Sequence, residues 1–120
     1  MISFKDVLEE VVERVPKSLT GMIIGKDGII VEKYQNDKSS LDADILGAEY
    51  SGIMSDVQKL ISIFHMDNLW DITISLENFI VIIHLISEDY YFINILAQGS
   101  NEGLGRYKTR VGSLKLRELF

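Results

Sequence analysis

The segment Ser100–Arg110 combines the residue types most able to do chemistry in this chain, two closely spaced glycines followed by three basic side chains. Phosphate-binding loops use such glycines to bring backbone amides close to an oxyanion, and an arginine can stabilise the charge of a nucleotide. A dinucleotide-binding fingerprint, however, requires a third glycine at the position that Lys108 occupies. The segment therefore does not match that motif.

A capped helix start explains the same segment better. Ser100 or Asn101 is a favourable N-cap because its side-chain oxygen can accept a hydrogen bond from a free helix amide, and Glu102 suits the positive helix start. Arg106 and Arg110 then share one helix face, where they lie in solvent or pair with nearby acids. We expect neither residue to act as an arginine finger.

A second glycine-rich segment, which begins at Gly21, is a near miss to the P-loop motif. A P-loop has four residues between its glycines and a serine or threonine after its lysine. Here only three residues separate Gly21 from Gly25, and Asp27 places a negative charge where a phosphate would lie. Asp-Gly between two apolar runs is instead a strong signal for a β-hairpin turn.

The remaining titratable residues do not form a catalytic or metal-binding set. His65 and His84 are isolated, with no second ligand at metal-binding spacing, and His84 is better explained as a hydrogen-bonded residue of a strand. Asp42, Glu49 and Asp56 recur every seven residues, which separates them by about 10 Å along a helix, too far to share a proton. We therefore expect no enzyme activity, no catalytic residue, no metal site and no cofactor.

The composition and the charge indicate one folded domain, residues 1–120. Hydrophobic residues make up 47% of the chain, so a packed core is expected, and the lack of cysteine excludes disulfides and thiolate metal sites. The net charge of −6 argues against nucleic acid as a partner. No apolar run approaches the roughly 20 residues of a membrane span, and the first residues do not resemble a signal peptide. We expect a cytoplasmic protein without membrane insertion.

The spacing of apolar residues predicts the order helix, two strands, helix, three strands, helix. The strands are expected at Leu19–Ile24, Ile29–Tyr34, Trp70–Leu76, Phe79–Ile86 and Tyr90–Ala97. The first helix is expected to end before Pro16, the second to begin near Leu41, and the third to follow Asn101 with apolar positions at Leu104, Tyr107, Val111 and Leu114. Short turns between the last three strands imply antiparallel pairing, so the fold class is α+β with helices on both faces of the sheet.

The long second helix has two distinct faces. One is an apolar stripe made by Leu46, Tyr50, Ile53, Val57, Leu60 and Phe64. The other consists of small residues, with Gly47, Ser51 and Ser55 recurring every four residues beside Ala48 and Gly52. Each glycine inside a helix costs about 1 kcal/mol relative to alanine. We expect close approach of another backbone, within the domain or across a dimer, to offset this cost; a kink is the alternative.

Three local stretches, together with the order of elements, make the chain resemble a known family. They are Gly21–Gly28 in the first hairpin, Leu41–Ala48 at the start of the long helix and Gly99–Tyr107 before the final helix. The chain resembles the Roadblock (dynein light-chain) family and, within it, the bacterial regulators of Ras-like GTPases. The resemblance covers nearly the whole chain. It implies a five-stranded antiparallel sheet with the first and last helices on one face and the long helix on the other.

The resemblance also implies a homodimer, in which the long helices pack together and the third strands join edge to edge. The strand Trp70–Leu76 fits this role because it contains no proline or inward lysine that would protect an edge from pairing. The residues expected in the interface are Gly47, Ala48, Ser51, Gly52, Ser55, Trp70, Ile72 and Ile74.

The function that the resemblance implies is non-catalytic. A dimer of this type would bind a Ras-like small GTPase and modulate its nucleotide cycle, in some members as an activator that supplies no arginine finger. We place the GTPase contact on the exposed part of the long helices, around Glu49, Asp56 and Lys59. Two alternatives remain open: a scaffold or assembly subunit with no effect on hydrolysis, and a PAS-like or profilin-like small-molecule sensor, which predicts a cavity of roughly 300 Å³ or more.

Overall fold

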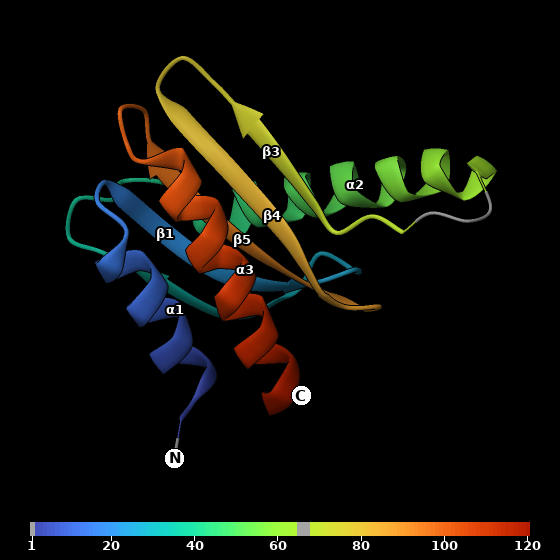
Figure 1. The fold of residues 1–120 in the computed structure, drawn as a ribbon, viewed down its shortest axis with the longest axis horizontal. Coiled ribbons are helices and arrows are strands. Elements are labelled where there is room, and N and C mark those ends of the chain that lie inside the picture. Colours follow the sequence, from blue (N-terminus) through green and yellow to red (C-terminus); the bar gives the residue numbers. More distant parts are fainter. Residues whose placement is uncertain (1, 65–67) are drawn as a thin grey trace.

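The computed structural model describes residues 2–64 and 68–120, so His65 lies outside the described residues. The order of elements is the one predicted (Figure 1). The helices are α1 (Phe4–Arg14), α2 (Ala43–Ile61), which continues into the short 3₁₀ turn η1 (Ser62–Phe64), and α3 (Glu102–Leu119). The strands are β1 (Ser18–Gly25), β2 (Ile30–Gln35), β3 (Asp71–Ser75), β4 (Phe79–Ser87) and β5 (Tyr90–Ala97).

The five strands form one antiparallel sheet in the order β2-β1-β5-β4-β3. Helices α1 and α3 lie on one face of this sheet and α2 lies on the other (Figure 1). The α+β fold class and the five-stranded antiparallel sheet are therefore confirmed. Because β2 and β3 are the two outermost strands, each has one side of its backbone unpaired within the sheet.

Helix α1 begins and ends where local chemistry requires it. Ser3 and Asp6 form a reciprocal capping box, in which the Ser3 side chain accepts from the Asp6 amide and the Asp6 carboxylate accepts from the Ser3 amide at 2.9 Å. The hydrogen bond from the Ser3 amide lowers the pKa of Asp6. Helix α1 ends at Arg14, because Pro16 has no amide hydrogen to continue it.

The segment between β1 and β2 is a hairpin turn, as the Asp-Gly pair predicted. The Asp27 carboxylate accepts a hydrogen bond from the Ile29 amide at 3.0 Å. Gly28 has a φ of 86°, a left-handed conformation that a residue with a side chain rarely adopts. The glycines of this segment therefore shape a turn, and the Asp27 carboxylate makes a hydrogen bond within that turn.

Each face of the sheet has its own apolar core. On the α2 side, the core consists of Met22, Ile24, Val81, Ile83, Tyr91, Ile93 and Ile95, covered by Ala43 and Met54 of the helix. On the other side, Ile23, Ile86 and Phe92 pack against Val7, Leu8 and Val11 of α1 and Leu116 of α3. Successive side chains along β4 and β5 point to opposite faces of the sheet, so each of these strands contributes to both cores.

A buried polar chain joins the sheet to α3. The Ser18 hydroxyl donates to Asn94 Oδ1 at 2.8 Å, and the Asn94 amide donates to Thr109 Oγ1 at 3.3 Å. Thr109 in turn donates to the carbonyl of Gly105 at 2.7 Å. Ser18, Asn94 and Thr109 are all buried, so their mutual hydrogen bonds replace the lost contacts with water.

No helix in the described part of the chain combines the length and the apolar character that a membrane span requires.

Candidate functional site

The small-residue face of α2 lies partly against the sheet of its own chain. A methyl group added at Gly47 would lie 2.8 Å from Ile24 Cδ1 and 3.0 Å from Met22 Sδ, so only glycine allows this approach without a shift of neighbours. The Ser51 hydroxyl is buried and donates to the carbonyl of Gly25 at 3.1 Å. The sequence left open whether the small residues pack within the domain or across a dimer. Gly47 and Ser51 pack within the domain.

The other small residues of α2 differ in exposure. Ala48 and Gly52 are exposed, and Ser55 is half-buried. A methyl group added at Gly52 would meet no described atom within 4 Å. Gly52 therefore has no packing partner within the described residues that would explain its presence in the middle of a helix.

The outer face of α2 mixes apolar and charged side chains. Glu49, Asp56 and Lys59, the residues we expect to contact a GTPase, are all exposed on it. Ile53, Leu60 and, in η1, Ile63 are also exposed, with exposed fractions of 39%, 63% and 68%. The predicted apolar stripe is thus divided, since Leu46 and Tyr50 pack against the core whereas Ile53 and Leu60 do not.

The shape of the molecule explains this exposure. Figure 1 shows that the C-terminal half of α2 extends past the sheet, so that no strand lies beneath it. The last fully buried side chain of the helix is Met54. A projecting helix with several exposed aliphatic side chains is typical of a surface that another protein covers.

Strand β3 provides a second unpartnered feature next to α2. It pairs only with β4, so its outer backbone groups remain free within the described sheet. Ile72 and Ile74 are half-buried and pack against the core on the α2 side, while Trp70, just before the strand, is 57% exposed. The expected interface residues of this strand therefore lie at a free edge.

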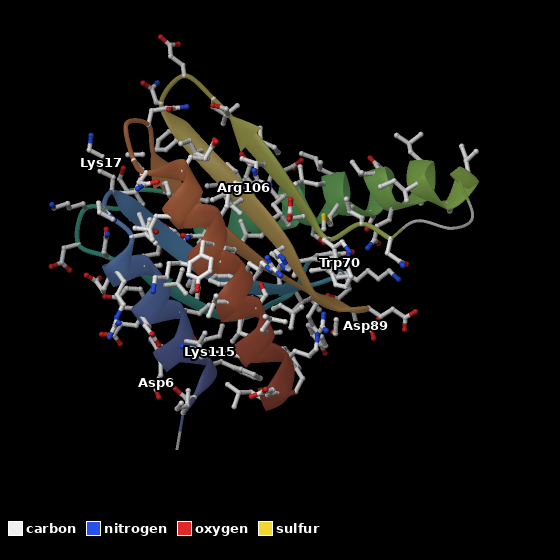
Figure 2. All side chains as sticks on the ribbon, viewed as in Figure 1. Asp6, Lys17, Trp70, Asp89, Arg106 and Lys115 are labelled. Carbon is white, nitrogen blue, oxygen red and sulfur yellow. The ribbon has the colours of Figure 1, made fainter. Side chains whose placement is uncertain are left out.

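The segment Ser100–Arg110 is a capped helix start, as predicted. Asn101 is the N-cap, and its side chain accepts a hydrogen bond from the Leu104 amide at 3.0 Å. A methyl group at Gly105 would lie 2.8 Å from Leu96 Cδ2, so this glycine lets the first turn of α3 press on the sheet. Arg106, which is labelled in Figure 2, pairs with Asp71 across 3.6 Å.

The surface also carries two hollows large enough for a small molecule. One, of about 550 Å³, lies between the end of α1, the start of β1 and the end of β2. There the Tyr34 hydroxyl donates a hydrogen bond to Glu13 at 2.6 Å. That hydrogen bond raises the pKa of Tyr34 to about 12. The other, of about 400 Å³, lies beside α3 and includes Trp70, His84 and Arg110.

Among the described residues, the one histidine is His84, which lies in β4. His84 Nδ1 makes a hydrogen bond to the Leu85 carbonyl at 2.9 Å, which confirms it as a hydrogen-bonded strand residue. Within residues 2–64 and 68–120, no group of three or more histidine or acidic side chains gathers closely enough to hold a metal ion.

Solved structures of other proteins share this arrangement of helices and strands. No family model and no curated protein sequence matches the chain. Among solved structures, MglC from Myxococcus xanthus is 29% identical with a TM-score of 0.73, over 99% of this chain and 100% of that one. A Roadblock/LC7 domain from Streptomyces avermitilis is 16% identical with a TM-score of 0.83, over 94% and 93% of the two chains. Myxococcus xanthus MglB is 12% identical with a TM-score of 0.87, over 98% and 94%.

This is a Roadblock/LC7 fold. The match extends over nearly the full length of both chains in each comparison, so it concerns the whole arrangement of helices and strands. The resemblance to the Roadblock family that the three sequence stretches suggested is therefore confirmed, and MglC and MglB are both among the similar structures.

Proposed function

We propose that this Roadblock-like chain, residues 1–120, is a non-catalytic regulator of a Ras-like small GTPase, acting as a homodimer in the bacterial cytoplasm. The observation that carries the proposal is the projecting half of α2, which combines exposed aliphatic and charged side chains. The similarity to MglB and MglC supports it, because these are small proteins of the same fold. The dimer would bind the GTPase and modulate its nucleotide cycle.

The free edge of β3 and the open position at Gly52 support dimerisation. Two copies of an unpaired edge strand can form an antiparallel pair and so satisfy the outer backbone groups of both. The α2 helices of the two protomers would then approach at Ala48, Gly52 and Ser55, where the side chains are small. Ile53 and Leu60 lie on the exposed side of the same helix and would gain cover from such an assembly.

The GTPase contact would lie on the outer face of α2, at Glu49, Asp56 and Lys59. These side chains are exposed and separate from those that hold the helix on the sheet, so they are available to a partner. No arginine finger forms part of the proposal. Arg106 is on the opposite face of the sheet and is paired with Asp71.

Charge reversal tests this location. The double variant Glu49→Lys and Asp56→Lys should weaken binding to the GTPase loaded with a non-hydrolysable GTP analogue by tenfold or more, because opposite charges across a contact become like charges. The chain should remain a dimer in sedimentation analysis. Glu118→Lys, an exposed acid near the end of α3, is the matched control and should bind normally. Unchanged affinity of the double variant would reject this surface.

The cognate GTPase can be found by affinity capture from the native cell, with the small GTPases in the eluate identified by mass spectrometry. Two protomers to one GTPase is the expected stoichiometry. A turnover assay with and without the protein then separates a regulator from a scaffold, since a scaffold would bind the GTPase and leave its hydrolysis rate unchanged. Absence of binding in every nucleotide state would reject the proposed function.

A further inference from the structure

A cleft of about 400 Å³ lies on the α3 side of the sheet, opposite the face that carries α2. Three parts of the chain form it: the residues at the start of β3, the second half of β4, and the flank of α3. Its lining includes Trp70, His84, Arg110, Ser113, Leu114 and Arg117. The proposed GTPase contact uses none of these residues, whereas the predicted dimer interface includes Trp70.

The cleft contains a buried hydroxyl without a partner. Ser113 is only 2% exposed, and among the described residues its Oγ makes no hydrogen bond. It does not form the bond to the carbonyl four residues earlier that helical serines often make. Buried hydroxyls without partners are uncommon, since they lose their bonds to water and gain nothing in return. Ser113 belongs to the lining of the cleft, and its hydroxyl is not committed to any other described residue.

His84 adds a second buried polar group. It is 7% exposed and stands opposite Asp71 in the register of β3 and β4. Its Nδ1 lies 2.9 Å from the Leu85 carbonyl oxygen. A carbonyl can only accept, so Nδ1 carries the hydrogen and Nε2 is the ring nitrogen left for another contact.

Two arginines give the cleft its charge. Arg117 donates from Nε to the Ile86 carbonyl at 2.7 Å, which holds the guanidinium in place and leaves its two terminal nitrogens for a ligand. Arg110 lies seven residues earlier on the same side of α3, about 10 Å away along the helix axis. Asp71 is the acidic residue of the cleft lining. A terminal nitrogen of Arg106 lies 3.6 Å from its carboxylate oxygen and offsets its charge. The lining is therefore net positive.

Apolar side chains stand beside these polar groups. Trp70 is more than half exposed at the edge of the cleft, and Leu114 of α3 is about half exposed (Trp70 is labelled in Figure 2). Pockets of roughly 300–1,000 Å³ that combine apolar walls with a few well-placed polar groups are typical of small-molecule sites.

We propose that this cleft binds a small organic anion, with a carboxylate or phosphate held by the two arginines and an apolar body packed against Trp70. Arg110 and Arg117 supply charge-assisted hydrogen bonds to the oxyanion, and Ser113 supplies a neutral one. The cleft would give the protein a ligand-binding activity separate from its proposed contact with a GTPase.

The sequence offers a direct probe of this site, because Trp70 is the only tryptophan of the chain. Phenyl phosphate and benzoate, which absorb little where tryptophan is excited, are titrated separately while the fluorescence of Trp70 is followed at low ionic strength and a fixed protein concentration. Benzyl alcohol serves as the neutral analogue. A saturable fluorescence change with at least one anion, absent with benzyl alcohol, is the expected result. Sedimentation analysis at the start and end of the titration shows whether the oligomeric state is constant.

Variants connect the signal to the cleft. Arg110→Gln should weaken binding about tenfold or more, because it removes a charged donor. Arg110 makes no hydrogen bond or ion pair with another described residue, so the fold does not depend on it. Ser113→Ala should weaken binding about threefold and keep the same circular dichroism spectrum and an unchanged or higher melting temperature. Arg14→Gln, on the exposed side of α1, is the matched control and should bind as the unmodified chain does.

Three outcomes would overturn the proposal. They are a response that does not saturate with either anion, equal affinity of the unmodified chain and Arg110→Gln, and an equal loss of affinity in Arg14→Gln. Each of these would show that the anions act on the tryptophan or on the total charge of the protein without occupying the cleft. The result is independent of GTPase binding, which the charge reversal on α2 tests separately.

Discussion

Substitution of Gly52 on α2 should change the stability of the single chain and the stability of the dimer in opposite directions, so the two can be measured separately. Glycine in the middle of a helix is about 0.8–1.0 kcal/mol less favourable than alanine. The space around Gly52 is open, because an added methyl group would meet no described atom within 4 Å. Gly52→Ala should therefore raise the free energy of unfolding of the single chain by about 0.8–1 kcal/mol.

Gly47 is the matched control on the same helix. A methyl group there would come within 2.8 Å of Ile24 Cδ1 and 3.0 Å of Met22 Sδ. Both atoms are at or near the ends of flexible side chains, so they can move, but the movement offsets the gain in helix propensity. We expect Gly47→Ala to be less stable than Gly52→Ala by about 1 kcal/mol, a typical cost of crowding in a packed core.

The assay is urea unfolding at a protein concentration low enough for the single chain to predominate, followed by circular dichroism. Sedimentation equilibrium at higher concentration then measures the dimer. If the two α2 helices approach at Gly52, Gly52→Ala should weaken the dimer while it stabilises the chain, and Gly52→Leu should weaken it further. A Gly52→Ala chain that is no more stable than the original would refute the structural reasoning. An unchanged dimer in Gly52→Leu would remove Gly52 from the interface.

Two further predictions concern stability within one chain. Asn94→Ala should lower the free energy of unfolding by about 1–3 kcal/mol in urea titrations, because it removes the partner of two buried hydroxyls, those of Ser18 and Thr109; a change below about 0.5 kcal/mol would contradict this. Asp6→Ala should be destabilising at neutral pH, and the difference from the original chain should shrink as the pH falls below about 4. The reason is that a lowered pKa contributes stability above the ordinary value for aspartate and loses it on protonation; a difference independent of pH would contradict it.

The strands could be predicted closely from the sequence because two independent signals mark them. Continuous or alternating apolar residues define each strand, and turn residues such as the Asp-Gly pair end it. Strand β5 has the predicted bounds, Tyr90–Ala97, and β1 extends the prediction by one residue at each end. The starts of α1 and α3 were equally clear, since Ser3 and Asn101 both act as N-caps through their side chains, whereas α2 begins at Ala43, two residues after the expected Leu41.

The buried faces of the helices could not be predicted in the same way. In α3, Tyr107 and Leu114 have helical spacing but are exposed, whereas Gly105, Thr109 and Gly112 are buried. Hydrophobic spacing gives little weight to glycine and threonine. Their burial depends on how closely the helix approaches the sheet, which is a property of the packed structure and not of the local sequence.

The cleft beside α3 could not be predicted from sequence patterns either. Trp70, His84 and Arg110 belong to three separate segments, and no two of them are close in the sequence. Their proximity depends on the register that sets His84 opposite Asp71 and on the position of α3 over the sheet. The sequence contained one useful signal, the concentration of basic residues in the last helix, which gives residues 100–120 a local charge of +3 against −9 for the rest.

The close packing of α3 accounts for both the position and the chemistry of the cleft. A methyl group at Gly112 would lie 2.9 Å from Phe92 and Val11, so the helix is held tightly over β4 and β5 and against α1. Strand β3 lies beyond this covered region at the edge of the sheet. Arg110 and Arg117 of α3 therefore line the same open cleft as the start of β3, and Ser113 is buried where the helix meets the sheet. Small residues on the inner face of one helix thus leave the neighbouring edge of the sheet open to a ligand.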